Sequence, residues 1–314
     1  MSVPEAIERA EPASAGFVYV ATGEQYVGEA RASAVTLRTH NIGARVCLVT
    51  DQRPPGQPFW DDLVLLPSSK FGFRDKLEMR RSPYERSVYL DADTHIGGDL
   101  SELFALLDRF DVCGVQLMEG HDYAMAGIPT PFAEINGGLL CFRRCERVAQ
   151  FFTLWERYYD EFLALNQRGD YHYANVGDQK SLRAAMWHSD VRFASVGPEF
   201  NFIPFKVEFA CLPVRVLHTR TSDGIPELFE RLNKVLARRT YVPLLDCVVG
   251  DHMPMSELWR LFSSSFRQLV RRFLRCLLPM RCKDFLRRFK PLKMAFLGSR
   301  FTSAKGDATN KWMR

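Results

Sequence analysis

Short apolar runs alternate with amphipathic segments through the first two thirds of the chain. Apolar residues at helical spacing predict helices. The aromatic stripe of the helix predicted at 145–167 is interpreted as core rather than as a substrate platform. Such alternation predicts an α/β fold with a mostly parallel central sheet flanked by helices. The predicted strands cover residues 16–21, 45–50, 63–66, 88–90, 111–117, 135–142, 191–196 and 214–218. The predicted helices cover residues 27–40, 99–104, 145–167 and 177–186.

Beyond residue 225 the pattern changes to helices with a basic face. Apolar residues recur at helical spacing from Leu258 to Leu277, with arginines on the opposite side. Residues 256–314 hold 15 Lys and Arg against 3 Asp and Glu, so their charge is +12 in a chain of +5, and the rest carries −7. We therefore expect a flexible N-terminus (1–15), an α/β domain (16–225) and a helical basic appendage (226–314).

The basic appendage is a candidate for membrane association. An apolar, aromatic face opposite arginines is typical of helices that lie on an anionic membrane surface, here residues 256–300. The alternative is a helix packed on the α/β domain with a solvated basic face. Nucleic-acid binding is not expected, because the sequence holds no known nucleic-acid-binding module.

The sequence also predicts a cellular location. The first 15 residues are polar and acidic, unlike a signal peptide, and no apolar run is long enough to cross a membrane. The eight cysteines include no CxxC pair, which favours a reducing compartment. We expect a cytoplasmic protein that attaches peripherally to the inner face of the membrane, and the sequence predicts no particular oligomeric state.

The apolar run at 88–90 is followed directly by two carboxylate residues, Asp91 and Asp93. Residues i and i+2 of an extended chain lie on the same side, and two carboxylates on one side offer hard oxygen ligands to a divalent cation. Ligands of parallel α/β sheets bind at the carboxyl ends of strands, where Thr22 and Tyr26 also lie. This pattern predicts a metal–nucleotide site; a loop in which Asp91 only caps the next element is the alternative.

The order of motifs resembles nucleotide-sugar glycosyltransferases of the GT-A fold, most closely glycosyltransferase family 8, which includes glycogenin-like and bacterial galactosyl- or glucosyltransferases. The resemblance covers residues 16–220. It implies a Rossmann-like domain that moves a sugar from a nucleotide diphosphate to an acceptor. The matching pieces, in chain order, are Val18 to Thr22 with Tyr26; Lys76; Val88 to Thr94 with Glu102 to Phe104; Asn136 to Leu140; Asp178 and Gln179; Asn201; and His218.

The resemblance implies a role for each matching position. The nucleoside contacts are Thr22 and Tyr26, and Lys76 lies near the diphosphate or donor sugar. The ligands of Mn²⁺ or Mg²⁺, which holds the donor diphosphate, are Asp91, Asp93 and His218, with Ala92 between the two carboxylates at the donor. The donor-sugar and acceptor side is lined by Asn136, Gly138, Asp178 and Gln179. The candidate catalytic residues among them are Asp178, Gln179 and Lys76.

The implied donor is a UDP-sugar, and the implied acceptor is a saccharide or glycolipid of cell-surface polysaccharide synthesis. The resemblance also implies retention of anomeric configuration by front-face internal return. Double displacement with Asp178 as the nucleophile stays open. Two departures concern the donor. Gly23-Glu24 replaces the usual Asn-Asp, and no Lys-Pro-Trp follows His218, so Arg220 is the candidate phosphate-side cation.

Three other classes compete with this interpretation. A haloacid-dehalogenase-type phosphatase also has a strand followed by Asp-x-Asp, but residue 95 is His, where that pattern needs Thr or Val, and the pair lies too far into the chain. A sugar nucleotidyltransferase needs a Gly-rich loop after the first strand, and Ala21 to Glu24 matches poorly. The non-enzyme alternative is a GT-A-like binding protein without turnover, against which intact Asp91, Asp93 and His218 argue.

Overall fold

The structure is a computed structural model that describes residues 14–56, 59–117, 127–167, 177–244 and 246–250. These residues belong to one compact unit. Most of the predicted N-terminal segment and the whole predicted membrane-associating segment (256–300) lie outside the described residues. Among the helices that are described, none combines the length and the apolar character needed to cross a membrane.

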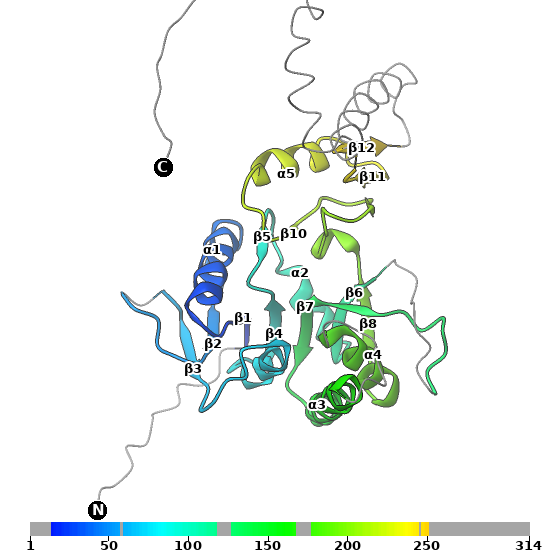
Figure 1. Cartoon of the computed structure of the whole chain (residues 1–314). Helices are drawn as coiled ribbons and strands as arrows, with labels where there is room; N and C mark the ends of the chain where they lie inside the picture. The colour runs from blue at the N-terminus through cyan, green and yellow to red at the C-terminus, as the bar shows by residue number, and fades with distance from the viewer. Residues whose placement is uncertain (1–13, 57–58, 118–126, 168–176, 245, 251–314) are drawn as a thin grey trace, which may run out of the picture. The chain divides into compact units, whose positions relative to one another are not determined.

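In the described part of the chain, the central sheet consists of β1 (Ala15–Val20), β2 (Val46–Thr50), β3 (Asp62–Leu65), β4 (Arg86–Leu90), β6 (Val112–Gln116), β7 (Ile135–Arg143) and β8 (Phe193–Val196). Their spatial order is β3–β2–β1–β4–β7–β6–β8 (Figure 1). Within the described part of this sheet, β7 alone runs antiparallel to its neighbours, β4 and β6, and the other strand pairs are parallel. The predicted α/β class with a mostly parallel central sheet is confirmed.

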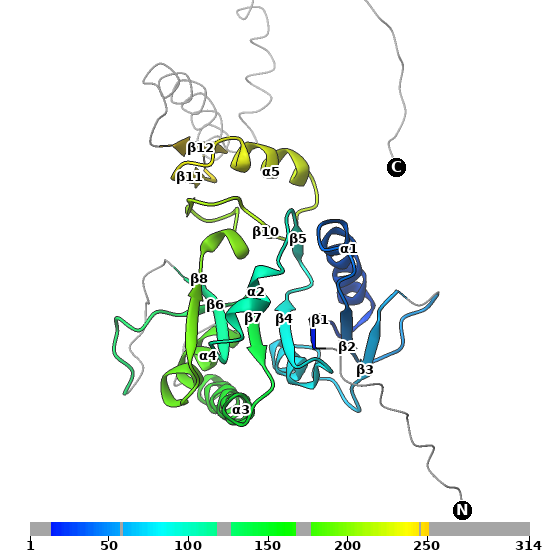
Figure 2. The same ribbon diagram turned by 180° about the vertical axis from the view of Figure 1, so that it is seen from behind.

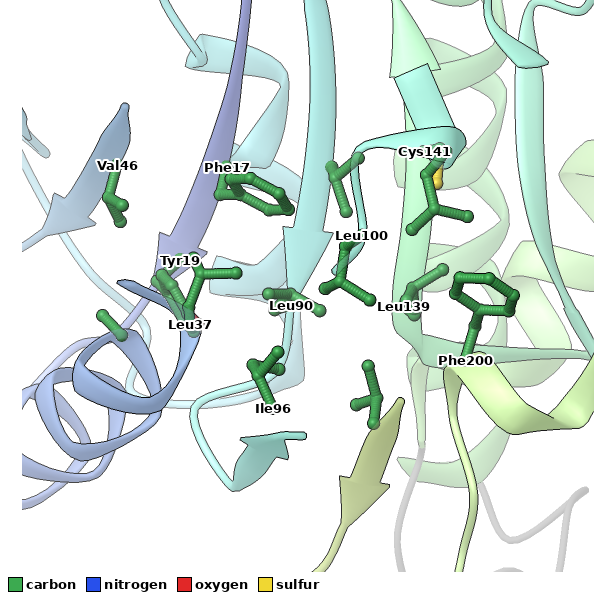
Figure 3. Close-up of a cluster of buried hydrophobic side chains, with 14 of the residues drawn as sticks. Phe17, Tyr19, Leu37, Val46, Leu90, Ile96, Leu100, Leu139, Cys141 and Phe200 are labelled. Carbon is green, nitrogen blue, oxygen red and sulfur yellow. The ribbon is translucent and has the colours of Figure 1, made fainter. Parts of the chain in front are cut away.

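Helices cover both faces of this sheet, because alternate strand residues point to opposite sides. In β1, Phe17 and Tyr19 join one buried cluster and Val18 joins the other. The first cluster, shown in Figure 3, packs the sheet against α1 (Glu24–His40) and the segment that leads into α2 (Glu102–Leu106). The second packs the sheet against η1 (Phe73–Arg81), α3 (Glu146–Gln167) and α4 (Asp178–His188).

The aromatic stripe of α3 is core, as predicted. Phe151 and Trp155 are fully buried, and Phe152 is nearly so. The indole N–H of Trp155 donates to the Ser181 hydroxyl at 3.1 Å and to the Asp178 carbonyl at 3.3 Å. The core helix α3 therefore holds the first turn of α4, where Asp178 lies.

A short two-stranded sheet follows the acidic pair. It pairs β5 (Thr94–Ile96) with β10 (Val216–His218) in antiparallel register, and both views place them side by side (Figures 1 and 2). β10 is the shorter form of the strand predicted at 214–218, whereas β5 was not predicted. Three residues are too few to show a strand period, and β5 exists because β10 supplies its partner.

A third sheet lies at the end of the described chain and contains β9 (Glu208–Ala210), β11 (Arg239–Val242) and β12 (Cys247–Gly250). Its core includes Phe202, Leu217 and Tyr241 together with Leu228 of α5 (Ile225–Asn233). The predicted boundary at residue 225 falls at the start of α5. Within the region expected to be helical, β11 and β12 form a hairpin of β-branched and aromatic residues.

A buried charge cluster lies at the end of the sheet opposite the carboxyl end of β4. Asp111, just before β6, is fully buried. Its carboxylate lies 2.8 Å from the guanidinium groups of Arg143 and Arg147 and 3.0 Å from that of Arg192. Burial alone would raise the pKa of Asp111, but Arg192, Arg147 and Arg143 outweigh burial and hold that pKa far below its ordinary value.

Candidate functional site

A cavity of about 500 Å³ opens where β1 and β4 end. Every residue predicted from the sequence as a site residue lines this cavity. These residues are Thr22, Tyr26, Lys76, Asp91, Ala92, Asp93, Asn136, Gly138, Asp178, Gln179 and His218. The fold thus brings together side chains that are spread over almost 200 positions of the sequence.

The acidic pair meets His218 because of the β5–β10 register. His218 pairs with Thr94, the residue after Asp93, and the Thr219 N–H donates to the Asp93 carbonyl at 2.9 Å. His218 Nε2 consequently lies 3.2 Å from Asp93 Oδ1 and 3.5 Å from Asp91 Oδ2. One ligand atom from each of the three side chains lies within 4.8 Å of the others.

These three side chains fit a divalent cation. Neighbouring ligands of an octahedral ion with bonds of about 2.1 Å lie about 3.0 Å apart, close to the distances from His218 to the carboxylates. Two carboxylates with one imidazole form a mixed donor set that suits Mn²⁺. The three side chains are only 16–21% exposed, so they are shielded yet still line the cavity.

The turn that carries the acidic pair is anchored on both sides. The Thr94 hydroxyl donates to the Asp91 carbonyl at 2.8 Å, and the Asp91 N–H donates to the Gly138 carbonyl at 2.9 Å. The Thr94 hydroxyl also lies 2.8 Å from that of Ser33, which is 3.0 Å from the Tyr19 hydroxyl. Helix α1 and strand β1 therefore brace the turn, so Asp91 is held rather than mobile.

Lys76 bridges two carboxylates in the cavity. Its Nζ lies 3.0 Å from Asp91 and 2.9 Å from Asp178 Oδ2. Burial disfavours the charged ammonium, but Asp178 and Asp91 outweigh burial and raise the pKa of Lys76. The structure therefore places a permanent positive charge between the acidic pair and the first turn of α4.

Tyr89 was not predicted as a site residue, although it lines the cavity. Its hydroxyl donates to Asp91 Oδ1, whereas Asp91 Oδ2 accepts a hydrogen bond from Lys76 and lies 3.5 Å from His218 Nε2. Burial, followed by Asp91, raises the pKa of Tyr89 well above its ordinary value, so this hydroxyl keeps its proton. The signal was present, because Tyr89 and Asp91 are two positions apart at the end of a strand.

The paired glycines Gly137 and Gly138 lie at positions that leave no room for a side chain. A Cβ at Gly137 would lie 2.3 Å from Asp178 Oδ2, and a Cβ at Gly138 would lie 2.3 Å from His218 Cε1. The missing side chains thus make room for other residues of the site, and no larger residue fits there without moving them.

Thr22 and Tyr26 lie at the end of the cavity nearest β1 and α1. The Thr22 hydroxyl donates to Asp75 Oδ2 at 3.0 Å, and Asp75 also accepts the N–H groups of Lys70 and Phe71 at 2.8 Å. Asp75 was missed by the sequence analysis, since one Asp in a polar segment has no distinguishing pattern. It ties the loop before η1 to the end of β1. Tyr26 is 41% exposed, so its ring is available to a ligand.

Arg220 connects Tyr26 with the acidic pair. Its guanidinium carbon lies 5.5 Å from the centre of the Tyr26 ring, and its Nε lies 3.3 Å from Asp93 Oδ2. Burial would raise the pKa of Asp93, but His218 and then Arg220 outweigh burial and lower that pKa to about 2. Asp93 is therefore ionised and ready to bind a cation at neutral pH.

No protein-family model matches the chain, and no curated protein sequence matches it. Among solved structures, the chain is similar to the glycosyltransferase GlyE of Streptococcus pneumoniae TIGR4, with a TM-score of 0.47 and 16% identity over 71% of this chain and 61% of that one. It thus spans about three fifths of GlyE.

The chain is also similar to the galactosyltransferase LgtC in complex with donor and acceptor sugar analogs. The TM-score is 0.44, with 14% identity over 70% of this chain and 95% of LgtC. Mouse xyloside xylosyltransferase 1 gives a TM-score of 0.45, with 14% identity over 68% of this chain and 100% of that one. Similarities of this size assign no activity, so the function proposed next rests on the side chains of the cavity.

Proposed function

We propose that the protein is a metal-dependent glycosyltransferase that takes a sugar from a nucleotide-diphosphate donor. One observation carries the proposal. Asp91 and Asp93 lie on one turn, and His218 comes from a strand far along the chain; one ligand atom from each converges within 4.8 Å of the others, in a cavity also lined by Lys76 and Arg220. A hard cation site beside two fixed positive charges is complementary to a diphosphate.

The chemistry requires stabilisation of the departing nucleoside diphosphate. A divalent cation held by Asp91, Asp93 and His218 would act as a Lewis acid for the negative charge that develops there. Lys76 adds a buried positive charge that needs no reorganisation during the reaction. Arg220 replaces the lysine that the resemblance leads one to expect after the histidine, and it supplies a second cation at the cavity wall.

The acceptor and donor sugar would lie on the side of the cavity formed by Asn136, Gly138, Asp178 and Gln179. Lys76 is ion-paired with Asp178 Oδ2, which holds that carboxylate in place. We infer retention of configuration by front-face internal return, with Asp178 and Gln179 orienting the sugar. Double displacement by Asp178 would leave a glycosyl group covalently attached to it, which mass spectrometry of the enzyme mixed with donor alone detects.

The donor class is a UDP-sugar, with a base that would stack near Tyr26 and contact Thr22. The acceptor class is a saccharide or glycolipid, and peripheral attachment at an anionic inner membrane surface would bring the enzyme to it. Replacing Arg260, Arg267, Arg271 and Arg275 together by Gln should abolish sedimentation of the full chain with phosphatidylserine vesicles. Unchanged sedimentation would contradict the membrane proposal and leave the transferase proposal intact.

A thermal-shift screen of nucleotides, with and without Mn²⁺, tests the donor proposal. UDP should raise the melting temperature only when Mn²⁺ is present, and the variant Asp93→Asn should lose that shift. The proposal fails if no nucleotide stabilises the protein under either condition. Mn²⁺-dependent hydrolysis of a UDP-sugar then distinguishes an enzyme from a binding protein, because only the enzyme releases free sugar.

A further inference from the structure

We infer that Asn201 is a positioning residue that, together with Asn136, holds Nδ1 of His218 as a hydrogen-bond donor, so that Nε2, beside the two carboxylates, is the nitrogen that gives up its proton and binds a cation. This inference rests on the proposed function, since it concerns the same cation site. Three consecutive hydrogen bonds link the imidazole to a backbone N–H, which can only donate.

The first hydrogen bond orients Asn136. The backbone N–H of Gly138 can only donate, and the side chain of Asn136 lies 2.7 Å from it. The Asn136 atom at this position must therefore be the amide oxygen, Oδ1, because the amide NH₂ group has no acceptor to offer.

The second hydrogen bond transfers this orientation to Asn201. The same Asn136 oxygen lies 2.8 Å from the side-chain amide of Asn201. Since Asn136 presents an acceptor, Asn201 must present its NH₂ group, Nδ2. The Asn201 oxygen must then point the other way, and it lies 3.0 Å from His218 Nδ1.

The third hydrogen bond sets the tautomer of the imidazole. The Asn201 oxygen only accepts, so His218 Nδ1 must carry a proton and donate it. In neutral imidazole the other nitrogen, Nε2, then has its lone pair free. This is the nitrogen that faces Asp93 at 3.2 Å and Asp91 at 3.5 Å, and it is the only ring atom with the geometry to join them as a ligand.

Burial makes this arrangement hard to reverse. Asn136 and Asn201 are 4% and 2% exposed, so water does not compete for either amide. Turning either amide would bring two donors or two acceptors face to face, and buried polar groups without partners are costly. The pair of amides therefore presents His218 with the correct nitrogen before a cation arrives, which lowers the cost of binding one.

Direct Mn²⁺ titration of the full-length protein tests the inference, with no donor present. Asn201→Leu removes both hydrogen bonds at similar volume, and loss of such a partner typically weakens metal binding roughly 10- to 100-fold. The matched control is Asn41→Leu. Asn41 is also buried and hydrogen-bonds Leu37 and Leu100, far from the cavity, so its replacement should lower stability and leave Mn²⁺ affinity unchanged.

A second variant and a second measurement separate orientation from folding. Asn201→Asp keeps an oxygen toward His218 Nδ1 but sets an acceptor against Asn136 Oδ1, so it should be less stable than wild type and still bind Mn²⁺ more tightly than Asn201→Leu. The ¹⁵N shifts of His218, recorded without metal on the neutral ring, should show the Nδ1–H tautomer in wild type and Asn201→Asp and a mixture in Asn201→Leu.

The possible outcomes are distinct. Equal Mn²⁺ affinity and one tautomer in wild type and Asn201→Leu would overturn the inference and leave the proposed function standing. Equal losses in Asn201→Leu and Asn41→Leu would also overturn it, because a general loss of stability would then be the cause. No Mn²⁺ binding by wild type would instead refute the cation site itself.

Discussion

Replacing Gly138 by alanine tests the site at a single atom. The backbone of Gly138 lies between His218 and Asn136. The added Cβ would sit 2.3 Å from His218 Cε1, 2.4 Å from His218 Nδ1 and 2.9 Å from Asn136 Oδ1. Ordinary contact begins at 3.4 Å, so the imidazole must retreat by about 1 Å.

That displacement is large on the scale of metal coordination. Ligand distances in a metal site are held within about 0.2 Å, so a retreat of about 1 Å removes His218 from the ligand set. Loss of a ligand or of its support weakens binding by about 100-fold. A concentration of Mn²⁺ at 100 times the wild-type Kd stabilises the native state by about 2.7 kcal/mol, and a 100-fold weaker site gains only about 0.4 kcal/mol.

Thermal melts of wild type and Gly138→Ala at this Mn²⁺ concentration measure the difference. Wild type should gain several degrees in Tm and the variant about one degree or less. Two other glycines provide matched controls. The Cβ of Gly137→Ala meets Asp178 at 2.3 Å instead of His218, and that of Gly28→Ala meets nothing within 4 Å.

Both controls should keep the Mn²⁺-dependent shift. Gly28→Ala, within helix α1, should in addition raise the metal-free stability by about 0.5–1 kcal/mol. A folded Gly138→Ala protein that binds Mn²⁺ as tightly as wild type would refute the assignment of His218 as a metal ligand.

Three further predictions concern other charges. Lys76→Met should lower kcat for sugar transfer by roughly 100-fold in steady-state assays, because a fixed charge at the leaving group is lost; an unchanged kcat would exclude that role. Arg220→Gln should lower kcat/KM for the donor about tenfold, since this exposed cation contributes at the low end for charged contacts, and Arg220→Lys should recover most of it; equal loss in both variants would argue against a simple charge effect. Asp111→Asn should destabilise the protein by about 3 kcal/mol, because three arginines lose their buried partner. The folded-state pKa of Asp111 lies below its ordinary value, so the stability that its ionised form contributes is complete above about pH 4 and declines as pH falls toward the folded-state pKa. Urea unfolding at a series of pH values measures this, and a difference in unfolding free energy between wild type and variant that stayed constant with pH would contradict it.

The sequence predicted the central sheet well, because buried parallel strands are continuous apolar runs. The strand before Asp91 and the aromatic helix α3 carry strong patterns and appear where expected. The elements that were missed are short. β5 and β9 have three residues each, and partners distant in the sequence stabilise them, so local spacing contains little trace of them.

The site shows the same division. Period two placed Asp91 and Asp93 together, and the order of motifs added residues as distant as Asp178 and His218, all of which line one cavity. Asp75 was missed because one Asp in a polar segment has no distinguishing pattern, and Tyr89 was missed although its position two residues before Asp91 placed both side chains on one side of the strand. The orientation of Asn201 was also inaccessible, because it depends on three hydrogen bonds among residues 65 and 17 positions away.

The reversed direction of β7 has a consequence for how this protein tolerates change. Because β7 starts beside the end of β4, one strand supplies Asn136 and Gly138 to the cavity and Arg143 to the charge cluster around Asp111 at the other end. The cavity and the buried charge cluster thus share one nine-residue strand but occupy its opposite ends. Substitutions at the cavity end leave the ion pairs of the cluster in place, so ligand binding and thermal resistance can change independently.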